Sequence, residues 1–133
     1  SKTIGLALSD VSGMLASPME TIRRGKFTED VRRLKEIIAG EDVGALILGL
    51  PISMDGTEGP RCQSVRDFGR NLLQNIDIAI AFWDERLSTA AVQRVLIKEA
   101  DMTRKRRAEV VDKMAAAYIL QGALDAIKGM AAG

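Results

Sequence analysis

The fold of this chain is decided around one stretch, Gly49-Leu50-Pro51-Ile52-Ser53-Met54-Asp55-Gly56-Thr57-Glu58-Gly59-Pro60-Arg61. It continues the apolar run 45–48, and its Gly59-Pro60 pair opens an amphipathic segment. Proline suits the first turn of a helix, where its missing N–H costs nothing. An apolar run, a polar loop and a helix start are the layout that places a functional loop at the C-terminal end of a buried strand. A plain strand-to-helix connector has the same layout, so this alternative stays open.

The composition indicates one domain and restricts the chemistry. A chain of 133 residues can bury a core, and 47% hydrophobic residues is normal for a globular protein. The single cysteine, Cys62, excludes a disulfide within the chain and suits a reducing compartment, so we expect a cytoplasmic protein. The longest apolar run, residues 43–52, is too short to span a bilayer, and no membrane partner is expected. The chain has no histidine, so a catalytic site must use carboxylates with a metal.

Alternating apolar patterns predict an α/β fold. We expect strands at 3–8, 14–22, 43–50 and 78–83, and helices at 28–40, 59–75, 88–99 and 108–127. The first two strands form a hairpin with Pro18 at a bulge or edge, and the last two read as buried strands. Thr28 is the expected N-cap of the first helix, and the second helix turns Val65, Phe68, Leu72 and Leu73 inward. A hairpin followed by strands joined through helices predicts a mixed sheet with helices on both faces.

Three carboxylates are candidates for catalysis. Asp84 and Glu85 directly follow a predicted strand and precede a predicted helix, a position that faces a cleft in α/β folds. Asp112 lies in the last helix, and Ala115 and Ala116 after it would let that helix approach the sheet closely. Acids from separate elements can share Mg²⁺, as phosphodiester cleavage with two metals requires. The ordinary alternatives are an acidic first turn paired with Arg86, and a solvated aspartate.

Basic residues near these acids could bind a phosphate backbone. The net charge is only +1, so nucleic-acid binding would have to come from a local patch. Aromatic residues are 4%, which argues against a base-stacking platform. A solubilising surface is the alternative for each cluster. The candidates are Arg61, Arg66, Arg86, the run Arg104-Lys105-Arg106-Arg107, and a loop cluster of Arg23, Arg24 and Lys26.

Four segments resemble the YqgF/RuvX family. They read SKTIGLALSD at 1–10, GLPISMDGTEGPR at 49–61, DERLST at 84–89 and VDKMAAAYILQ at 111–121. The resemblance implies a single RNase H-like domain over 1–133, related to RuvC-type resolvases. It implies a metal-dependent nuclease that uses Mg²⁺ or Mn²⁺ and matures the 5′ end of pre-16S ribosomal RNA. Asp84, Glu85 and Asp112 match the family's acidic positions, with Glu85 and Asp112 as metal ligands.

Two other functions stay open beside the ribosomal one. The first is resolution of Holliday junctions, whose two-fold substrate would favour a homodimer. The second is a nucleic-acid-binding module without catalysis. In the family, a strand ending in an Asp-x-Gly motif precedes the segment that matches Ser1–Gly5 and carries the first catalytic aspartate. We expect that strand, apparently missing here, to lie between the strands at 3–8 and 43–50. Asp10, at the far end of the first strand, would be a poor substitute.

Overall fold

The computed structural model describes residues 3–86 and 104–132. The chain divides into two compact units, one made of residues 1–23 and 87–133 and the other of residues 24–86. The units are treated separately below. The predicted α/β class is confirmed, with strands and helices in the expected order. The helix predicted at 88–99 lies outside the described residues.

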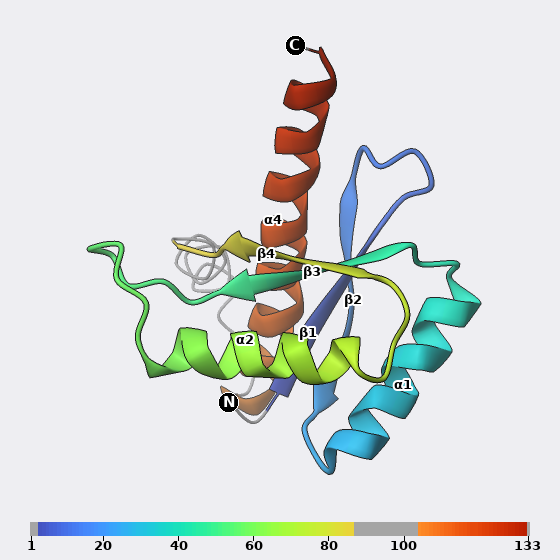
Figure 1. Ribbon diagram of the computed structural model, residues 1–133, viewed down its shortest axis with the longest axis vertical. Helices are drawn as coiled ribbons and strands as arrows, with labels where there is room; N and C mark the ends of the chain where they lie inside the picture. Colours follow the sequence, from blue (N-terminus) through green and yellow to red (C-terminus); the bar gives the residue numbers. More distant parts are fainter. Residues whose placement is uncertain (1–2, 87–103, 133) are drawn as a thin grey trace. The chain divides into compact units, whose positions relative to one another are not determined.

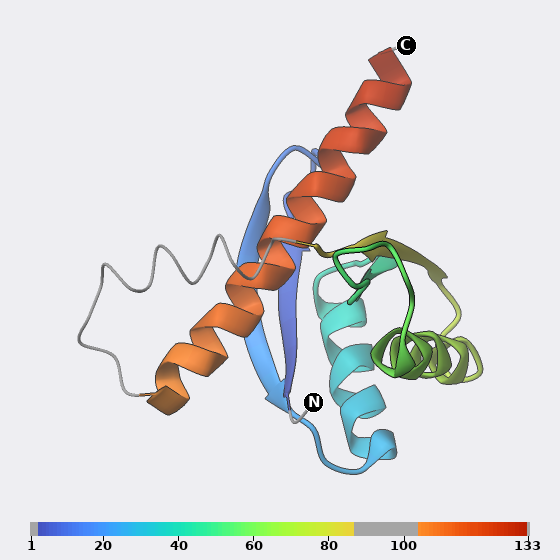
Figure 2. The same ribbon diagram turned by 90° about the vertical axis from the view of Figure 1, so that its left-hand side faces the viewer.

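The first unit is a β-hairpin crossed by one long helix. Strands β1 (Thr3–Ser9) and β2 (Ala16–Arg23) pair antiparallel, as predicted. The register shifts between Leu6 and Ala7, where Ala7 lies opposite Pro18. Pro18 therefore occupies an irregularity in the ladder, where a residue without an N–H is tolerated. Helix α4 (Arg104–Ala132) lies across this hairpin and contacts both strands (Figure 2).

Helix α4 packs closely against β1 because β1 has a glycine at the crossing point. A Cβ atom at Gly5 would overlap the backbone carbonyl of Asp112 and lie 2.9 Å from the Cβ atom of Asp112. On the helix side, Val111 and Ala115 are buried. The expected close approach of the last helix to the sheet is therefore confirmed, and Gly5 is the residue on the strand that permits it.

The second unit is a parallel strand pair with two helices. Strands β3 (Ala45–Leu50) and β4 (Ala79–Asp84) pair in parallel, and the connection between them contains α2 (Pro60–Leu73) (Figure 1). Pro60 opens α2, as predicted. Helix α1 (Phe27–Gly40) meets α2 through an edge-to-face contact of Phe27 with Phe68, 5.9 Å between ring centroids. The buried apolar residues of this unit are Val31, Leu34, Ile37, Leu50, Cys62, Leu72 and Ile76.

The strands of the described residues thus form two two-stranded sheets, one antiparallel and one parallel. The antiparallel pair and the parallel pair are the two kinds of strand pairing that the predicted mixed α/β fold requires. The strand expected between β1 and β3 is not among the described residues and stays a prediction.

Two helix predictions at the level of single residues are wrong. Helix α1 begins at Phe27, and its N-cap is Lys26, which makes no side-chain capping bond, so Thr28 is not the cap. The aromatic contact of Phe27 places it inside the first turn. In α2, Leu72 is 1% exposed but Leu73 is 56% exposed. Successive helical residues point about 100° apart, so only one of the two leucines can face inward.

The strands and the last helix also differ from the prediction. Strand β4 alternates between half-buried and exposed residues, with Trp83 36% exposed. It is therefore covered on one face, where Gly69 of α2 approaches Phe82, and is not a fully buried strand. Helix α4 begins at Arg104, four residues before the predicted start. Arginine and lysine are good helix formers, so the basic run forms the first turn and does not precede the helix.

Candidate functional site

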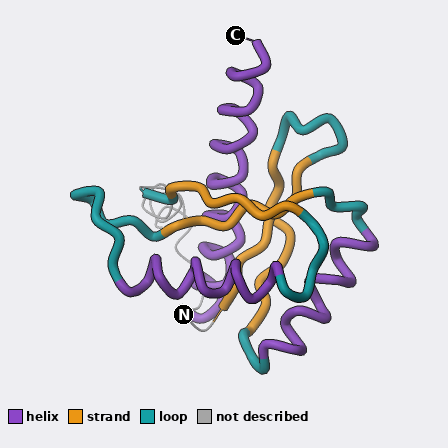
Figure 3. The backbone as a smooth tube through the Cα atoms, in the orientation of Figure 1, coloured by secondary structure: helices purple, strands orange, loops and turns teal. Residues whose placement is uncertain are grey.

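The acidic pair Asp84-Glu85 lies where the two parallel strands end. Asp84 is the last residue of β4 and pairs with Leu50, the last residue of β3. One residue on, the backbone N–H of Glu85 donates to the carbonyl of Leu50 (3.1 Å). The loop 51–59 starts at this same edge and leads into α2 (Figure 3). The carboxyl ends of parallel strands are where α/β proteins place their binding sites.

The two adjacent carboxylates have different environments. Asp84 accepts hydrogen bonds from Nε of Arg86 (2.6 Å) and from the Arg86 backbone N–H (3.0 Å), which lower the pKa of Asp84. Glu85 is half-buried, and burial raises its pKa above the ordinary value, opposed by the charge of Arg61 and supported by that of Asp84. Asp84 is therefore neutralised by a neighbour, whereas Glu85 bears an incompletely compensated charge.

Hydrogen bonds hold the loop 51–59 at its turn and at its end. Asp55 accepts hydrogen bonds from the hydroxyl (2.7 Å) and the N–H (3.0 Å) of Thr57, around Gly56 with φ of 89°. Glu58 accepts two hydrogen bonds from Arg66, at 2.8 and 2.9 Å, which lower the pKa of Glu58. These bonds tie the end of the loop to the helix α2 that follows it.

Arg66 is already engaged by its own unit. Besides the two bonds to Glu58, its guanidinium lies 5.2 Å from the ring centroid of Phe82 in β4. Arg86 is likewise engaged by Asp84. The predicted nucleic-acid contacts of these two arginines stay predictions, and the structure gives both a second role within the protein. Arg61, on the first turn of α2, is exposed and acts on Glu85 only through its charge.

Asp112 belongs to the other unit, on α4. Its Oδ2 atom accepts a hydrogen bond from the hydroxyl of Thr3 in β1, and the residue is half-buried. The structure thus brings Asp84 and Glu85 together in one unit and describes Asp112 separately with β1. Within either unit, the described residues contain no group of three acidic or cysteine side chains arranged to hold a metal. All three acids offer the carboxylate oxygens that Mg²⁺ and Mn²⁺ prefer, so the donor set fits such an ion.

Asp10 is occupied in a turn. Its carboxylate accepts hydrogen bonds from the backbone N–H of Met14 (2.8 Å) and Leu15 (3.2 Å) and from the hydroxyl of Ser12 (3.0 Å). The backbone bonds lower the pKa of Asp10. The carboxylate therefore shapes the hairpin turn, and the expectation that it is a poor substitute for the first catalytic acid stays a prediction.

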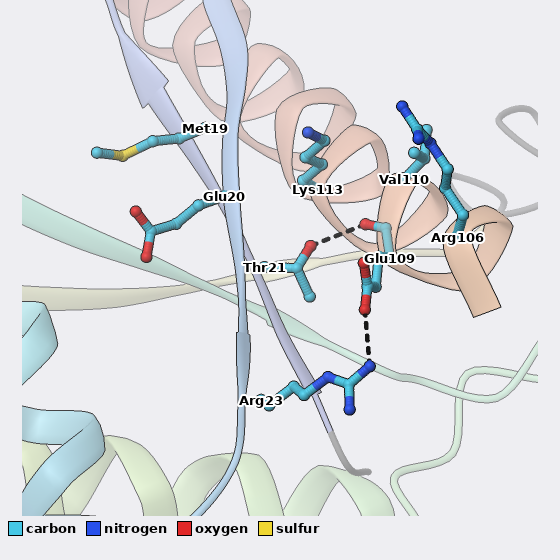
Figure 4. Close-up of a pocket in the computed structure, with 8 residues that line it drawn as sticks. All are labelled: Met19, Glu20, Thr21, Arg23, Arg106, Glu109, Val110 and Lys113. Atoms are coloured by element: carbon cyan, nitrogen blue, oxygen red, sulfur yellow. Dashed lines mark hydrogen bonds and ion pairs between the residues drawn. The ribbon is translucent and has the colours of Figure 1, made fainter.

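A pocket of about 570 Å³ lies between β2 and the beginning of α4 (Figure 4). Glu109 lines this pocket: its carboxylate pairs with Arg23 (3.1 Å), and its carbonyl accepts a hydrogen bond from the Thr21 hydroxyl (2.8 Å). The pocket gathers cations from two elements, Arg23 from the strand and Arg106 and Lys113 from the helix. The full lining is Met19, Glu20, Thr21, Arg23, Arg106, Glu109, Val110 and Lys113.

Lys113 is a basic residue that the sequence analysis did not single out. It follows Arg106 by seven residues, or two helical turns, so the two share a helix face once α4 is known to begin at Arg104. In the rest of the basic run, Arg104 is exposed and Arg107 is half-buried with its Nε atom lacking a hydrogen-bond partner. The side chain of Lys105 lies outside the described residues.

A family profile described as "RuvX: Holliday junction resolvase" matches residues 1–126. The chain belongs to the RuvX family. The match includes the loop 49–61, the Asp84-Glu85-Arg86 segment and the stretch 111–121, so the resemblance seen in these motifs is confirmed. No helix among the described residues of this RuvX-family chain is long and apolar enough to cross a membrane.

Three relatives of this RuvX-family chain carry the same name. A protein of Paramagnetospirillum magneticum is 65% identical over 131 residues, which cover 98% of this chain and 84% of the relative. One of Ruegeria sp. is 63% identical over 127 residues, 96% of this chain and 80% of the relative. One of Rhodospirillum centenum is 63% identical over 132 residues, 96% of this chain and 70% of the relative. Each is named "Putative pre-16S rRNA nuclease".

Proposed function

We propose that this RuvX-family chain is a metal-dependent nuclease that hydrolyses phosphodiester bonds of pre-16S rRNA during ribosome biogenesis. The names of relatives that are 63–65% identical support the substrate. The observation that carries the chemistry is Glu85, a half-buried carboxylate with a raised pKa at the carboxyl end of two parallel strands. Such perturbed acids concentrate at functional sites.

Glu85 and Asp112 are the residues that would hold the metal, Mg²⁺ or Mn²⁺, with Asp84 as the third catalytic acid. When bound, the ion would neutralise phosphate charge and lower the pKa of the attacking water. Glu85 suits this role because partial burial removes water from its charged carboxylate, and a bound cation would compensate that charge. Asp84 is held by Arg86, so its carboxylate stays ionised and is presented in one orientation.

The basic residues would bind the backbone of the nucleic acid. The positive charge of Arg61 acts on Glu85, and the Arg61 side chain is exposed. Arg61 would therefore bind a phosphate at the cleavage site. Arg104, Arg106, Lys105 and Arg107, at the beginning of α4, would make further contacts with phosphates. Contacts of this kind position the substrate without reading its sequence.

A four-way DNA junction is the second candidate substrate. The family profile is described as that of a Holliday junction resolvase, which favours this alternative. A junction has two equivalent strands to cut, so this function would go with a homodimer. Binding without cleavage is the third possibility, and it would use the basic residues without requiring the carboxylates of Asp84, Glu85 and Asp112.

A cleavage assay separates these functions. The full-length protein is incubated with pre-16S rRNA or with a four-way DNA junction, in Mg²⁺, Mn²⁺ or EDTA. We expect cleavage of the RNA that EDTA abolishes and that Asp112→Asn removes, since this change keeps volume and deletes charge. Asp125→Asn, an exposed aspartate on the same helix, is the matched control and should cleave normally. Cleavage that persists in EDTA would contradict the metal mechanism, and cutting of the junction alone would replace the substrate.

A further inference from the structure

Strand β1 holds Asp112 by two contacts from neighbouring positions on one face. The hydroxyl of Thr3 donates to Oδ2 of Asp112. Gly5, two residues on, leaves the space in which the Asp112 backbone lies. Residues i and i+2 of a strand point to the same side, so both contacts come from the face of β1 that α4 covers. One contact places the backbone of Asp112 and the other places its carboxylate.

The Thr3 hydrogen bond restricts rotation of the Asp112 carboxylate, which packing of the backbone does not fix. The terminal torsion of an aspartate has a broad energy profile, so a carboxylate held only at its backbone can turn. A hydrogen bond to one oxygen selects an orientation and leaves lone pairs on the other oxygen. Removing a hydrogen-bond partner of a metal-ligating side chain typically lowers metal affinity by about 10- to 100-fold.

We propose that Thr3 is a positioning residue for Asp112, which orients the carboxylate toward a divalent cation. This inference rests on the proposed function, in which Asp112 is a metal ligand. The proposed role of Thr3 is distinct from docking of the helix, because other hydrogen bonds also attach α4 to the hairpin. The Thr21 hydroxyl donates to the carbonyl of Glu109 (2.8 Å), and the side chain of Gln121 accepts from the N–H of Ala16 (2.9 Å).

Thr21 provides a matched control within the same hairpin. It lies directly opposite Gly5 in the β1–β2 ladder, and its hydroxyl also donates to α4, but to a backbone carbonyl. Thr3→Val and Thr21→Val each replace a hydroxyl with a methyl group of similar size. Both remove one hydrogen bond between the hairpin and the helix, and only the first touches a carboxylate.

The test measures Mn²⁺ binding by electron paramagnetic resonance, without nucleic acid, in the full-length protein. We expect Thr3→Val to weaken Mn²⁺ binding about 10- to 100-fold and to raise the Mg²⁺ concentration for half-maximal cleavage by a similar factor. Thr3→Ser, which keeps the hydroxyl, should restore both values. Thr21→Val should bind Mn²⁺ like the wild type even where its melting temperature falls.

The outcomes separate this inference from the proposed function. If Asp112→Asn abolishes Mn²⁺ binding and Thr3→Val leaves it unchanged, the role of Thr3 is refuted and the metal site stands. If Asp112→Asn binds Mn²⁺ normally, Asp112 is no ligand and the role of Thr3 is refuted with it, whereas the cleavage assay with EDTA still decides the nuclease activity. Equal losses in Thr3→Val and Thr21→Val would mean that both act through docking of the helix, which also overturns the inference.

Discussion

Replacing Gly5 with alanine tests the close contact between β1 and the backbone of α4 at Asp112. The added methyl group would overlap the carbonyl of Asp112, an atom of the backbone in α4. A helix backbone cannot rotate away as a side chain can, so the helix must move off β1. The same movement would displace Asp112 and break its bond with Thr3.

The magnitude follows from two opposing terms. Overpacking a tightly packed site costs roughly 1–3 kcal/mol, and a backbone obstacle places this change at the upper end, about 3 kcal/mol. Alanine in a strand gains roughly 0.5–1 kcal/mol over glycine through lower entropy of the unfolded chain. The net loss in free energy of unfolding is about 2 kcal/mol. For a chain of this size each kcal/mol shifts the melting temperature by roughly 3–5 °C, so we expect a fall of about 6–10 °C.

Thermal unfolding followed by circular dichroism at 222 nm measures this change, since α4 is the longest described helix. Gly129→Ala is the control, because it lies in the same helix with open space around it and no atom within 4 Å of the added Cβ. It should leave the melting temperature unchanged or raise it. Gly69→Ala should cost less than Gly5→Ala, because the obstacle at 2.9 Å is the ring of Phe82, which can turn. A melting temperature for Gly5→Ala within about 2 °C of the wild type, which corresponds to less than about 1 kcal/mol, would refute the reasoning.

Two further predictions concern the basic residues. Replacing Arg104, Lys105, Arg106 and Arg107 with glutamine should lower the slope of log K against log salt by about one for each lost phosphate contact, and an unchanged slope would identify the run as a solvated surface. Arg66→Met should speed proteolytic cleavage of the loop 51–59 while costing at most about 1 kcal/mol, because the Glu58 pair is solvent-exposed. Arg70→Gln, which loses only a 3.3 Å pair with Asp67, is its control, and equal proteolysis of the two variants would exclude Arg66 as the anchor of the loop.

Local sequence patterns predicted most of the elements, because those patterns reflect the backbone itself. The Pro60 helix start and the irregularity opposite Pro18 follow from the missing N–H of proline, which acts in any context. The choice between Leu72 and Leu73 depends on which side of α2 meets the strands, and an apolar pair is compatible with either. The predicted start of α4 is four residues too late, because an apolar pattern marks only the packed part of a helix, whereas the basic run before it favours a helix by intrinsic propensity.

In the candidate site, too, local sequence predicted the positions of the acids but not the contacts between distant side chains. Position after a strand identified Asp84 and Glu85, but adjacent acids in a sequence cannot show which one is neutralised. That depends on Arg86 turning back onto Asp84, a contact between side chains. The bonds of Thr3 with Asp112 and of Arg23 with Glu109 join residues 109 and 86 positions apart in the sequence. No local pattern could have paired them.

The last prediction concerns the cost of keeping Glu85 charged. Burial raises its pKa above the ordinary value of 4.5, so the folded protein holds this proton more tightly than the unfolded chain does. Stability from this group is then complete below about pH 4.5 and is lost as the pH rises through the folded pKa. At pH 7, with EDTA present, Glu85→Gln should therefore be more stable than the wild type, and the difference should vanish toward pH 4.

Asp84→Asn is the matched control with the opposite sign. Its pKa is lowered by Arg86, so the stabilisation is present above the ordinary value of 3.8, and the variant should be no more stable than the wild type at pH 7. Urea titrations between pH 4 and 8 measure both variants, and cleavage assays at pH 7 complete the comparison. A gain in stability together with a loss of cleavage would mean that Glu85 is kept charged for chemistry, at the expense of the fold. A Glu85→Gln variant that is less stable at pH 7 and still cleaves would show instead that the carboxylate serves the structure.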